Sequence, residues 1–276
     1  IELGAGNGEM MKIMIESFKK FPLFFNSCTF IIHEKSPKLI KKQKTNIKFK
    51  NVKWVENLKK INNLPSIFLA NEFFDAIPVK QFLKVKNAWF EKFVHVDLKK
   101  KIHFVNQKID IRKIEKKINF KISKKQDFIE YSPLGLKYLT DIFKIIKKNR
   151  GGLLIIDYGY FSEKMKDTLQ AIHKKKYSKV LENIGQSDIT YNINFYFIKK
   201  ITKNFQKLDI NFTSQKNFLN NLGIKKRAEM ISKNKTFTEK IDIFYRLKRL
   251  INEKEMGNLF KVMLIKNSSS NSKIGF

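Results

Sequence analysis

The stretch that decides the fold is Ile1-Glu-Leu-Gly-Ala-Gly-Asn-Gly8, at the start of the sequence. An apolar beginning followed by glycines at alternate positions is typical of a strand that ends in a tight, glycine-rich turn. Residues 10–20 then place apolar side chains at helical spacing, which predicts a helix directly after the turn. We therefore expect a strand, a glycine loop and a helix in that order.

The same alternation continues outward from this stretch. Short apolar runs predict further strands at 29–33, 52–55, 66–71 and 152–158. Such runs suit central strands that are buried on both faces. Ser36 and Pro37 fit an N-cap and the first residue of a helix. The remaining elements expected are a helix at 132–147, a strand at 208–213, helices within 215–234 and 239–253, and a strand at 259–265. This pattern predicts an α/β fold with a mostly parallel, doubly wound sheet, whose ligand lies at the carboxyl ends of the strands.

The chain is expected to form a single domain over residues 1–276. Residues 81–86 and 89–96 alternate weakly around Asn87-Ala88, which predicts an inserted hairpin. We place the core at about 1–80, 130–160 and 205–266, the hairpin region at 81–129, a helical cap at 161–204 and a flexible tail at 267–276. Trp54 and Trp89 lie in apolar strands, where aromatic residues are usually part of the core.

The composition is that of a folded protein with a strongly basic surface. Hydrophobic residues make up 42% of the chain, and 57 Lys and Arg against 25 Asp and Glu give a net charge of +32. Almost all of the excess is lysine, whereas arginine is the better residue for bidentate recognition of phosphates and bases. Nucleic acid is therefore an improbable partner. A single cysteine excludes an intrachain disulfide, and we expect neither a membrane span nor a metal.

The glycine loop predicts a ligand site. Gly4-x-Gly6-x-Gly8 follows a strand and opens a helix, so backbone can approach a ligand closely. Its spacing departs from the G-x-G-x-x-G of dinucleotide binders, which cradle a pyrophosphate; S-adenosylmethionine has no phosphate to cradle. Glu34 follows the second strand and can accept hydrogen bonds from ribose hydroxyls, and Glu2 can fix the loop or the methionine amine. The alternative to a ligand site is a tight turn with two surface carboxylates.

A further motif narrows the family. Ala70-Asn-Glu-Phe-Phe-Asp-Ala-Ile-Pro-Val79 places an amide and two carboxylates at the exit of the fourth strand. Here the chain resembles the MidA family of methyltransferases. The resemblance extends through further landmarks in order: Glu34-Lys-Ser-Pro-Lys-Leu with Gln43, Glu130-Tyr-Ser-Pro133, Ile156-Asp-Tyr-Gly159, Thr168-Leu169, Gly185-Gln-Ser-Asp-Ile-Thr190 with Phe195, Gln215 with Phe218-Leu219 and Leu222-Gly223, and Met256-Gly257 with Phe260-Lys261.

The resemblance implies a Rossmann-like, class I S-adenosylmethionine-dependent methyltransferase. It further implies protein arginine N-methylation that serves assembly of respiratory NADH dehydrogenase (complex I), with a subunit of that complex as the protein substrate. The location expected is the bacterial cytoplasm, or the mitochondrial matrix in a eukaryote. Two departures stand out, because the family's Gly-Asp-Phe segment before the first strand is not in this sequence and Asn192 stands where the family has a histidine.

Two alternatives stay open beside the methylation of arginine. The departures favour a non-catalytic assembly protein with a methyltransferase fold, and the charge favours an RNA methyltransferase. A nicotinamide oxidoreductase is opposed by the glycine spacing. The sequence also leaves a homodimer open.

With the resemblance in place, candidate residues can be named for cofactor binding and for catalysis. Those expected to bind the cofactor are Glu2, Gly4, Ala5, Gly6, Gly8, Glu34 and Asn71. Those expected to hold a guanidinium substrate and relieve it of a proton are Glu72, Asp75, Asp157, Tyr158 and Asp188. Carboxylates suit this task because they accept bidentate, charge-assisted hydrogen bonds. Helix capping by Asp75 and an ordinary strand-end turn at 157–159 are the structural alternatives, and we assign no catalytic histidine.

Overall fold

The computed structural model describes residues 1–61 and 63–276. The chain divides into two compact units. The first comprises Ile1–Phe73, Asp141–Ile156 and Gln206–Phe276, and the second comprises Phe74–Thr140 and Asp157–Phe205. Two elements, α5 (Pro133–Asn149) and β9 (Gly151–Tyr160), begin in one unit and end in the other.

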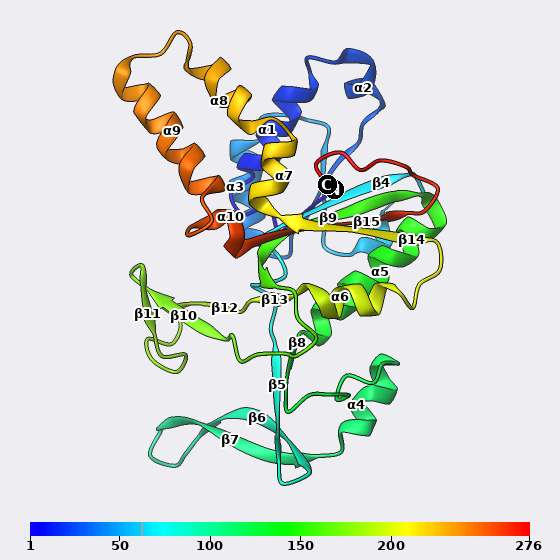
Figure 1. Ribbon diagram of the computed structural model, residues 1–276, viewed down its shortest axis with the longest axis vertical. Coiled ribbons are helices and arrows are strands. Elements are labelled where there is room, and N and C mark those ends of the chain that lie inside the picture. Colours follow the sequence, from blue (N-terminus) through cyan, green and yellow to red (C-terminus); the bar gives the residue numbers. More distant parts are fainter. Residues whose placement is uncertain (62) are drawn as a thin grey trace. The chain divides into compact units, whose positions relative to one another are not determined.

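The first unit is built on a mostly parallel sheet (Figure 1). Its strands follow the order β14-β15-β9-β4-β1-β2-β3. The pairs β1–β2, β1–β4, β2–β3 and β4–β9 are parallel, and β14–β15 is antiparallel. Besides β9, the strands are β1 (Glu2–Leu3), β2 (Phe30–His33), β3 (Val52–Val55), β4 (Ser66–Asn71), β14 (Leu208–Ser214) and β15 (Phe260–Asn267).

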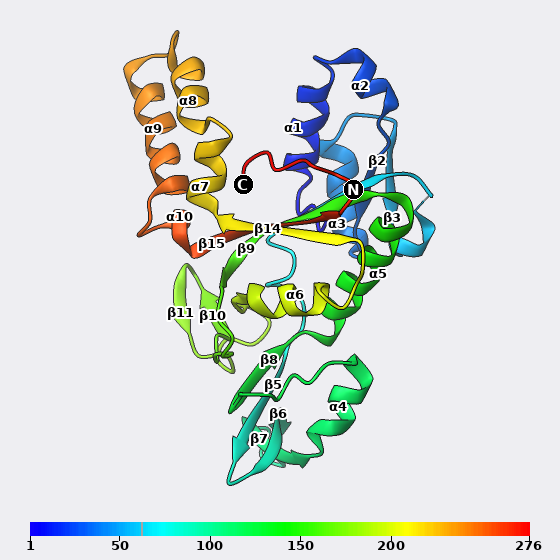
Figure 2. The ribbon, with the colours of Figure 1, turned by 45° about the vertical axis from the view of Figure 1, so that its right-hand side comes forward.

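Helices flank this sheet, with α1 and the last part of α5 on opposite faces (Figures 1 and 2). The core beside α1 contains Ala5, Met11, Ile15, Phe30 and Ile32. Strands β1 and β2 are buried along their whole length, as expected of covered parallel strands, whereas β3 lies at the edge of the sheet and Ile67 of β4 is 64% exposed. The helices of this unit besides α5 are α1 (Glu9–Phe18), α2 (Pro22–Ser27), α3 (Pro37–Asn46), α7 (Gln215–Asn221), α8 (Ile224–Ser232), α9 (Phe237–Ile251) and α10 (Met256–Leu259), with a 3₁₀ turn at Leu58–Lys60.

The second unit contains the expected hairpin within a larger sheet. Strands β5 (Lys80–Val85) and β6 (Ala88–Val96) pair antiparallel, and the two residues between them, Lys86 and Asn87, have φ of 45° and 67°. Positive φ at both central residues gives a turn that matches the twist of the strands. The full order is β7-β6-β5-β8, completed by β7 (Ile102–Ile109) and β8 (Phe128–Tyr131), with helix α4 (Ile111–Ile118) between them. Trp89 is buried in the core of this unit, as expected.

Residues 161–204, which we expected to be a helical cap, are only partly helical. They hold a three-stranded sheet in the order β11-β10-β12 and one helix, α6 (Phe195–Thr202). The strands are β10 (Gln170–His173), β11 (Lys176–Ser178) and β12 (Asp188–Thr190), and Lys174 and Lys175 turn the chain with positive φ. Beyond them, β13 (Ile193–Asn194) pairs in parallel with β9 at Gly159 and Tyr160.

Local signals explain several element boundaries. The Ser36 hydroxyl accepts from the Leu39 amide, which confirms the N-cap of α3. Helix α9 begins two residues before the expected Glu239, because Thr236 and Glu239 form a reciprocal capping box. Among the residues described, no helix is long and apolar enough to cross a membrane. The same residues contain no group of three or more His, Cys, Asp or Glu that could hold a metal ion.

Candidate functional site

The glycine loop between β1 and α1 is shaped for close approach of a ligand. Gly4, Gly6 and Gly8 all have positive φ, a conformation that side chains disfavour. A Cβ at Gly4 would lie 2.8 Å from Cδ2 of Phe73, so this glycine is needed for packing. A Cβ at Gly6 would meet nothing within 4 Å. Gly6 therefore borders open space, where the backbone can face a cofactor.

Glu34 is held rigidly at the end of β2. One carboxylate oxygen, Oε1, accepts from the amides of Lys35 and Ser36 at 2.9 and 3.0 Å. The other, Oε2, accepts from Nε2 of Gln43 at 3.1 Å. Each carboxylate oxygen can accept about two hydrogen bonds, so Oε2 keeps capacity for a ligand hydroxyl.

Gln43 links Glu34 to the glycine loop. Its side chain on α3 is fully buried, and its Nε2 also donates to the carbonyl oxygen of Gly6 at 2.9 Å. Its Oε1 accepts from the indole N–H of Trp54 at 2.9 Å. Trp54 thus packs against the core as expected and in addition orients this amide. The four residues form one connected network in the first unit.

Glu2 is a buried carboxylate with spare hydrogen-bonding capacity. Its exposed fraction is 3%, and its Oε2 has no hydrogen-bond partner among the residues described. Burial raises the pKa of Glu2 to about 7. A cationic group near Oε2, such as the amine of S-adenosylmethionine, would donate a hydrogen bond to this oxygen and stabilise the charged form of Glu2. Together with the open space at Gly6, this shows that the residues fit the cofactor.

Asn71 and Glu72 lie where β4 ends. The Glu72 amide donates to the carbonyl oxygen of Ile156 at 3.0 Å, which continues the pairing of β4 with β9 by one residue. Glu72 then turns the chain with φ of 47°. A residue other than glycine rarely adopts this conformation, and such strain concentrates at functional sites. The Glu72 side chain is exposed at the carboxyl edge of the sheet, where ligands of such folds bind.

The second unit brings together Asp75 and Asp157. Asp157 is fully buried; its Oδ2 accepts from the amides of Phe74 at 3.1 Å and Asp75 at 3.3 Å, and its Oδ1 from the amide of Tyr158 at 2.9 Å. Burial raises the pKa of Asp157 well above its ordinary value, and the charge of Asp75 raises it further. The carboxylate therefore orders the turn after β4.

Asp188 stands apart from this pair. It is exposed on β12, opposite Ile172 of β10, and no contact between it and Asp75 or Asp157 occurs among the described residues. Tyr158 follows Asp157 on β9 and is half-buried. The roles of these residues remain predictions.

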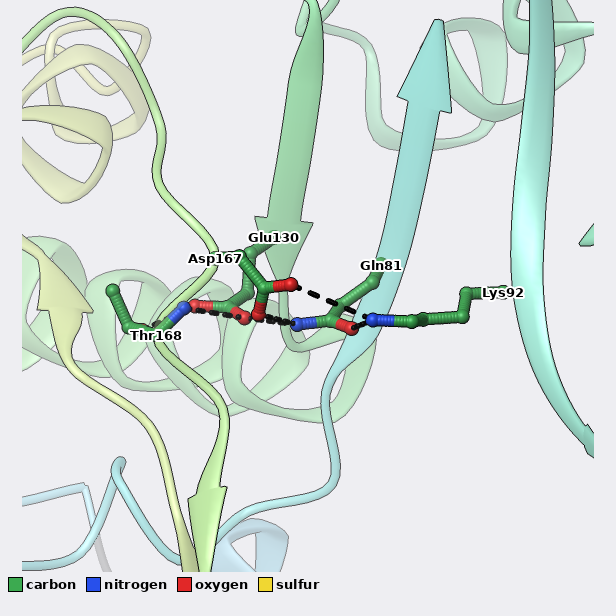
Figure 3. Close-up of polar contacts among 5 residues, drawn as sticks. All are labelled: Gln81, Lys92, Glu130, Asp167 and Thr168. Atoms are coloured by element: carbon green, nitrogen blue, oxygen red, sulfur yellow. Dashed lines mark hydrogen bonds and ion pairs between the residues drawn. The ribbon is translucent and has the colours of Figure 1, made fainter. Parts of the chain in front are cut away.

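A second polar network lies in the same unit, around Glu130 of β8 (Figure 3). Nε2 of Gln81 donates to Glu130 at 2.6 Å and to Asp167 at 2.7 Å. Thr168 donates to Glu130 through its amide at 3.3 Å and through its hydroxyl. The Thr168 hydroxyl also accepts from the Asn192 amide at 2.9 Å. The network thus ties β5 and β8 to the segments on either side of the three-stranded sheet.

Two residues central to these networks had no role in the sequence-based prediction. The sequence identifies Gln43 and Glu130 only as landmarks of the family resemblance. Gln43 sits four residues after Leu39 and four before Ile47, so it is a polar residue on the inward stripe of a helix. That position is a signal for a buried polar contact. Glu130 lies in a four-residue strand, too short for any comparable signal.

Comparison with known proteins identifies the family. Residues 1–213 match the family described as "Putative S-adenosyl-L-methionine-dependent methyltransferase". The chain belongs to this family. The resemblance to the MidA methyltransferases is confirmed, and the cofactor is S-adenosylmethionine. The residues that we expect to hold it are those of the glycine loop with Glu2, Glu34 and Asn71.

Two of the similar curated proteins carry the same description. Protein arginine methyltransferase NDUFAF7, mitochondrial, from Xenopus laevis is 25% identical over 95% of this chain and 65% of its own length. The human protein of that name is 24% identical over 94% of this chain and 64% of its own length. The chain therefore spans about two thirds of the length of these relatives.

Solved structures confirm the fold. A Burkholderia thailandensis protein bound to S-adenosyl-homocysteine superimposes with a TM-score of 0.81 at 21% identity, covering all of this chain and 73% of its own. A native crystal structure of an uncharacterised protein from the same organism gives a TM-score of 0.82, also at 21% identity, covering 75% of its own chain. The mostly parallel α/β sheet is thus the Rossmann-like fold of the S-adenosylmethionine-dependent methyltransferases.

Proposed function

We propose that this member of the family transfers the methyl group of S-adenosylmethionine to an arginine side chain of a protein, and that its substrate is a subunit of respiratory NADH dehydrogenase. The similarity to protein arginine methyltransferases over 95% of the chain supports the arginine. The observation that carries the proposal is the set of carboxylates at the carboxyl end of β4: Glu72 and Asp75 follow that strand, and Asp157 follows Ile156, the β9 partner of Asn71. A guanidinium is recognised by such groups through charge-assisted hydrogen bonds.

The chemistry divides between cofactor and protein. When bound, S-adenosylmethionine supplies an electrophilic methyl group on a sulfonium. A C–N bond forms, the C–S bond breaks, and the substrate nitrogen loses a proton. The rate of such an in-line displacement depends chiefly on how well the reacting groups are aligned. Good alignment corresponds to effective molarities on the order of 10⁵ M or more.

The residues of this chain supply that alignment and accept the proton. Glu72 orients the substrate nitrogen through its exposed carboxylate. The backbone conformation of this residue, with φ of 47°, fixes the direction of its Cα–Cβ bond. In the buried pair of Asp75 and Asp157, Asp157 has a raised proton affinity, because burial and the charge of Asp75 disfavour its charged form. This pair is suited to take up the proton released by the guanidinium.

The proposal is tested with methyl-labelled S-adenosylmethionine and purified NADH dehydrogenase subunits. We expect label on arginine, located by mass spectrometry, and a loss of at least 100-fold in rate with Glu72→Gln at nearly unchanged cofactor binding. Cofactor binding without transfer to any subunit would instead favour an assembly protein that uses the fold to bind. Label appearing only in added RNA would favour an RNA methyltransferase.

A further inference from the structure

Helices α8 and α9 form a hairpin within the first unit, where they lie side by side (Figures 1 and 2). Helix α9 has 15 residues, and none of them is fully buried. Its half-buried Ile243, Leu247 and Leu250 recur at helical spacing, so they form the face that packs against α7, α8 and α10. Most of the remaining surface of α9 is exposed to solvent.

A second apolar stripe runs along α9 and faces solvent. It consists of Phe237, Ile241, Phe244 and Tyr245, whose side chains are between 44% and 79% exposed. Residues at i, i+4, i+7 and i+8 share one face of a helix, so the four side chains are neighbours. A contiguous row of large, exposed apolar side chains marks a surface that binds a protein or a membrane.

Basic side chains border this stripe. Lys248 continues it by one further turn, and on the helix surface Lys240 and Arg249 flank it on either side. Such long side chains can lay their apolar stems along the stripe while their charged heads reach outward. The stripe therefore has an electropositive rim.

The acidic residues of α9 lie outside the stripe and are paired with basic residues. Lys235 binds Glu239 at 2.8 Å, and Arg246 binds Asp242 at 2.9 Å. Both carboxylates are on the side of the helix that turns away from Phe237. Repulsion of an anionic partner at the stripe is therefore small.

Helix α8 repeats the combination of apolar and basic side chains. Met230 and Ile231 are exposed, and Lys226 and Arg227 precede them by four residues, so each apolar side chain has a basic neighbour on the helix surface. Residues 224–251 carry nine Lys and Arg against three Asp and Glu, and three of the five arginines of the chain lie among them. Arginine binds phosphate through paired hydrogen bonds.

We propose that the α8–α9 hairpin docks on the surface of an anionic lipid bilayer. The stripe of Phe237, Ile241, Phe244 and Tyr245 enters the boundary between headgroups and acyl chains, and the basic rim contacts the lipid phosphates. Charge complementarity favours this occupant, because a helix with aromatic and aliphatic side chains on one face and Lys and Arg beside them is typical of membrane surfaces. Lysine is depleted from protein interfaces, and a nucleic acid would leave the aliphatic part of the stripe without a partner.

The chain offers a matched pair of variants. Tyr245 in the stripe is 67% exposed, and Tyr177 on β11 is 80% exposed. Tyr177 lies beside Lys175 and Lys176, so its surroundings are also basic, but it belongs to no apolar stripe. Tyr245→Ser and Tyr177→Ser therefore remove the same ring from an exposed, basic surface inside and outside the proposed docking site.

The first test is flotation of the protein with vesicles of phosphatidylcholine alone or of an equimolar mixture with phosphatidylglycerol. We expect saturable binding to the anionic vesicles and roughly 10-fold or more weaker binding to the neutral ones. Tyr245→Ser should weaken binding about fivefold or more, and Tyr177→Ser should leave it within about twofold. Equal binding by the two variants would overturn the proposal, because the charge of the whole chain would then account for the affinity.

A second test reports insertion directly. Tyr245→Trp and Tyr177→Trp each add one indole to the same background of Trp54 and Trp89. Brominated phosphatidylcholine in the anionic vesicles should quench the fluorescence of the indole at position 245 and not that at position 177. Absence of this difference would overturn the proposal, and so would self-association of the chain without vesicle binding, which would assign the stripe to a second copy.

The fold of the variants is checked independently of lipid. All four should bind S-adenosyl-homocysteine with the affinity of the unmodified protein, because none of the substitutions touches the glycine loop or Glu34. The docking surface is also separable from the proposed function. Vesicle binding without methyl transfer would keep the surface and reject the enzyme, and methyl transfer without vesicle binding would do the reverse.

Discussion

Nε2 of Gln43 lies 2.9 Å from the carbonyl oxygen of Gly6, so a residue on the helix after β2 holds the loop that follows β1. The same nitrogen reaches Glu34 at 3.1 Å. One buried amide thus sets the distance between the glycine loop and Glu34, the two parts of the site that we expect to contact the cofactor.

Gln43→Glu should therefore weaken cofactor binding more than it weakens the fold. The substitution replaces the shared donor with a carboxylate facing Glu34, and like charges at this range repel. We expect a loss of at least 10-fold in affinity for S-adenosyl-homocysteine by calorimetry. Gln107→Glu, at an exposed position of β7, makes the same chemical change and should leave the affinity within about twofold. Equal effects of the two variants would show that Gln43 has no positioning role.

Gly4 and Gly6 should differ when each is replaced by alanine. Both residues have positive φ, so both variants incur left-handed strain of roughly 1 kcal/mol. Only at Gly4 does the new Cβ also overlap the ring of Phe73. Overpacking costs typically ~1–3 kcal/mol, so Gly4→Ala should have the lower free energy of unfolding by about that amount in urea denaturation. A larger loss at Gly6 would contradict the assignment of open space there.

Binding of S-adenosyl-homocysteine should release protons. The pKa of Glu2 is raised to about 7 by burial. An ammonium group placed at its Oε2 would lower that pKa, so roughly half a proton should leave per ligand bound at pH 7. Calorimetry in buffers of different ionisation enthalpy measures this number. The release should disappear in Glu2→Gln; release that persists in this variant would locate it at another group.

The pair Asp75 and Asp157 should make stability depend on pH. Because the pKa of Asp157 is raised in the folded state, its protonated form stabilises the fold. This contribution to the free energy of unfolding is complete below the ordinary pKa of aspartate, about 3.9, and is lost as the pH rises through the raised pKa. Burial raises the pKa of Asp157 first, and the charge of Asp75 second. Asp75→Asn removes the second cause, so its stability relative to the unmodified protein should increase as pH rises from 5 to 8. Urea unfolding at several pH values checks this, and a constant difference would argue against coupling.

The fold was largely predictable from local patterns. The strands Val52–Val55 and Ser66–Asn71 have the bounds that their apolar runs indicated, because both runs have sharp compositional edges. The Ser36-Pro37 cap and the positive-φ glycines follow from the same local chemistry. Strand β7 and the three-stranded sheet were not predicted: the sequence of β7 lacks a clear period, and β10, β11 and β12 have only three or four residues each.

The candidate site was predictable in part. Residues at the ends of strands, such as Glu34 and Glu72, could be placed because parallel strands share one carboxyl edge. The partners of Asp157 could not, because its bonds to Phe74 and Asp75 span 83 and 82 residues. The link from Glu130 to Thr168 spans 38 residues and depends on how two insertions meet within the second unit. Tertiary contacts of this kind leave no periodic trace in a sequence.

The most direct test of the central claim is calorimetric titration of S-adenosylmethionine into the protein and into Gly6→Val. The branched side chain occupies the open space that the backbone of Gly6 borders, without meeting a protein atom within 4 Å of its Cβ. We predict saturable binding with one site in the unmodified protein and none in the variant, with both proteins folded by circular dichroism. Equal binding by the two proteins would contradict the glycine loop as the cofactor site, and absence of binding to the unmodified protein would contradict the enzyme itself.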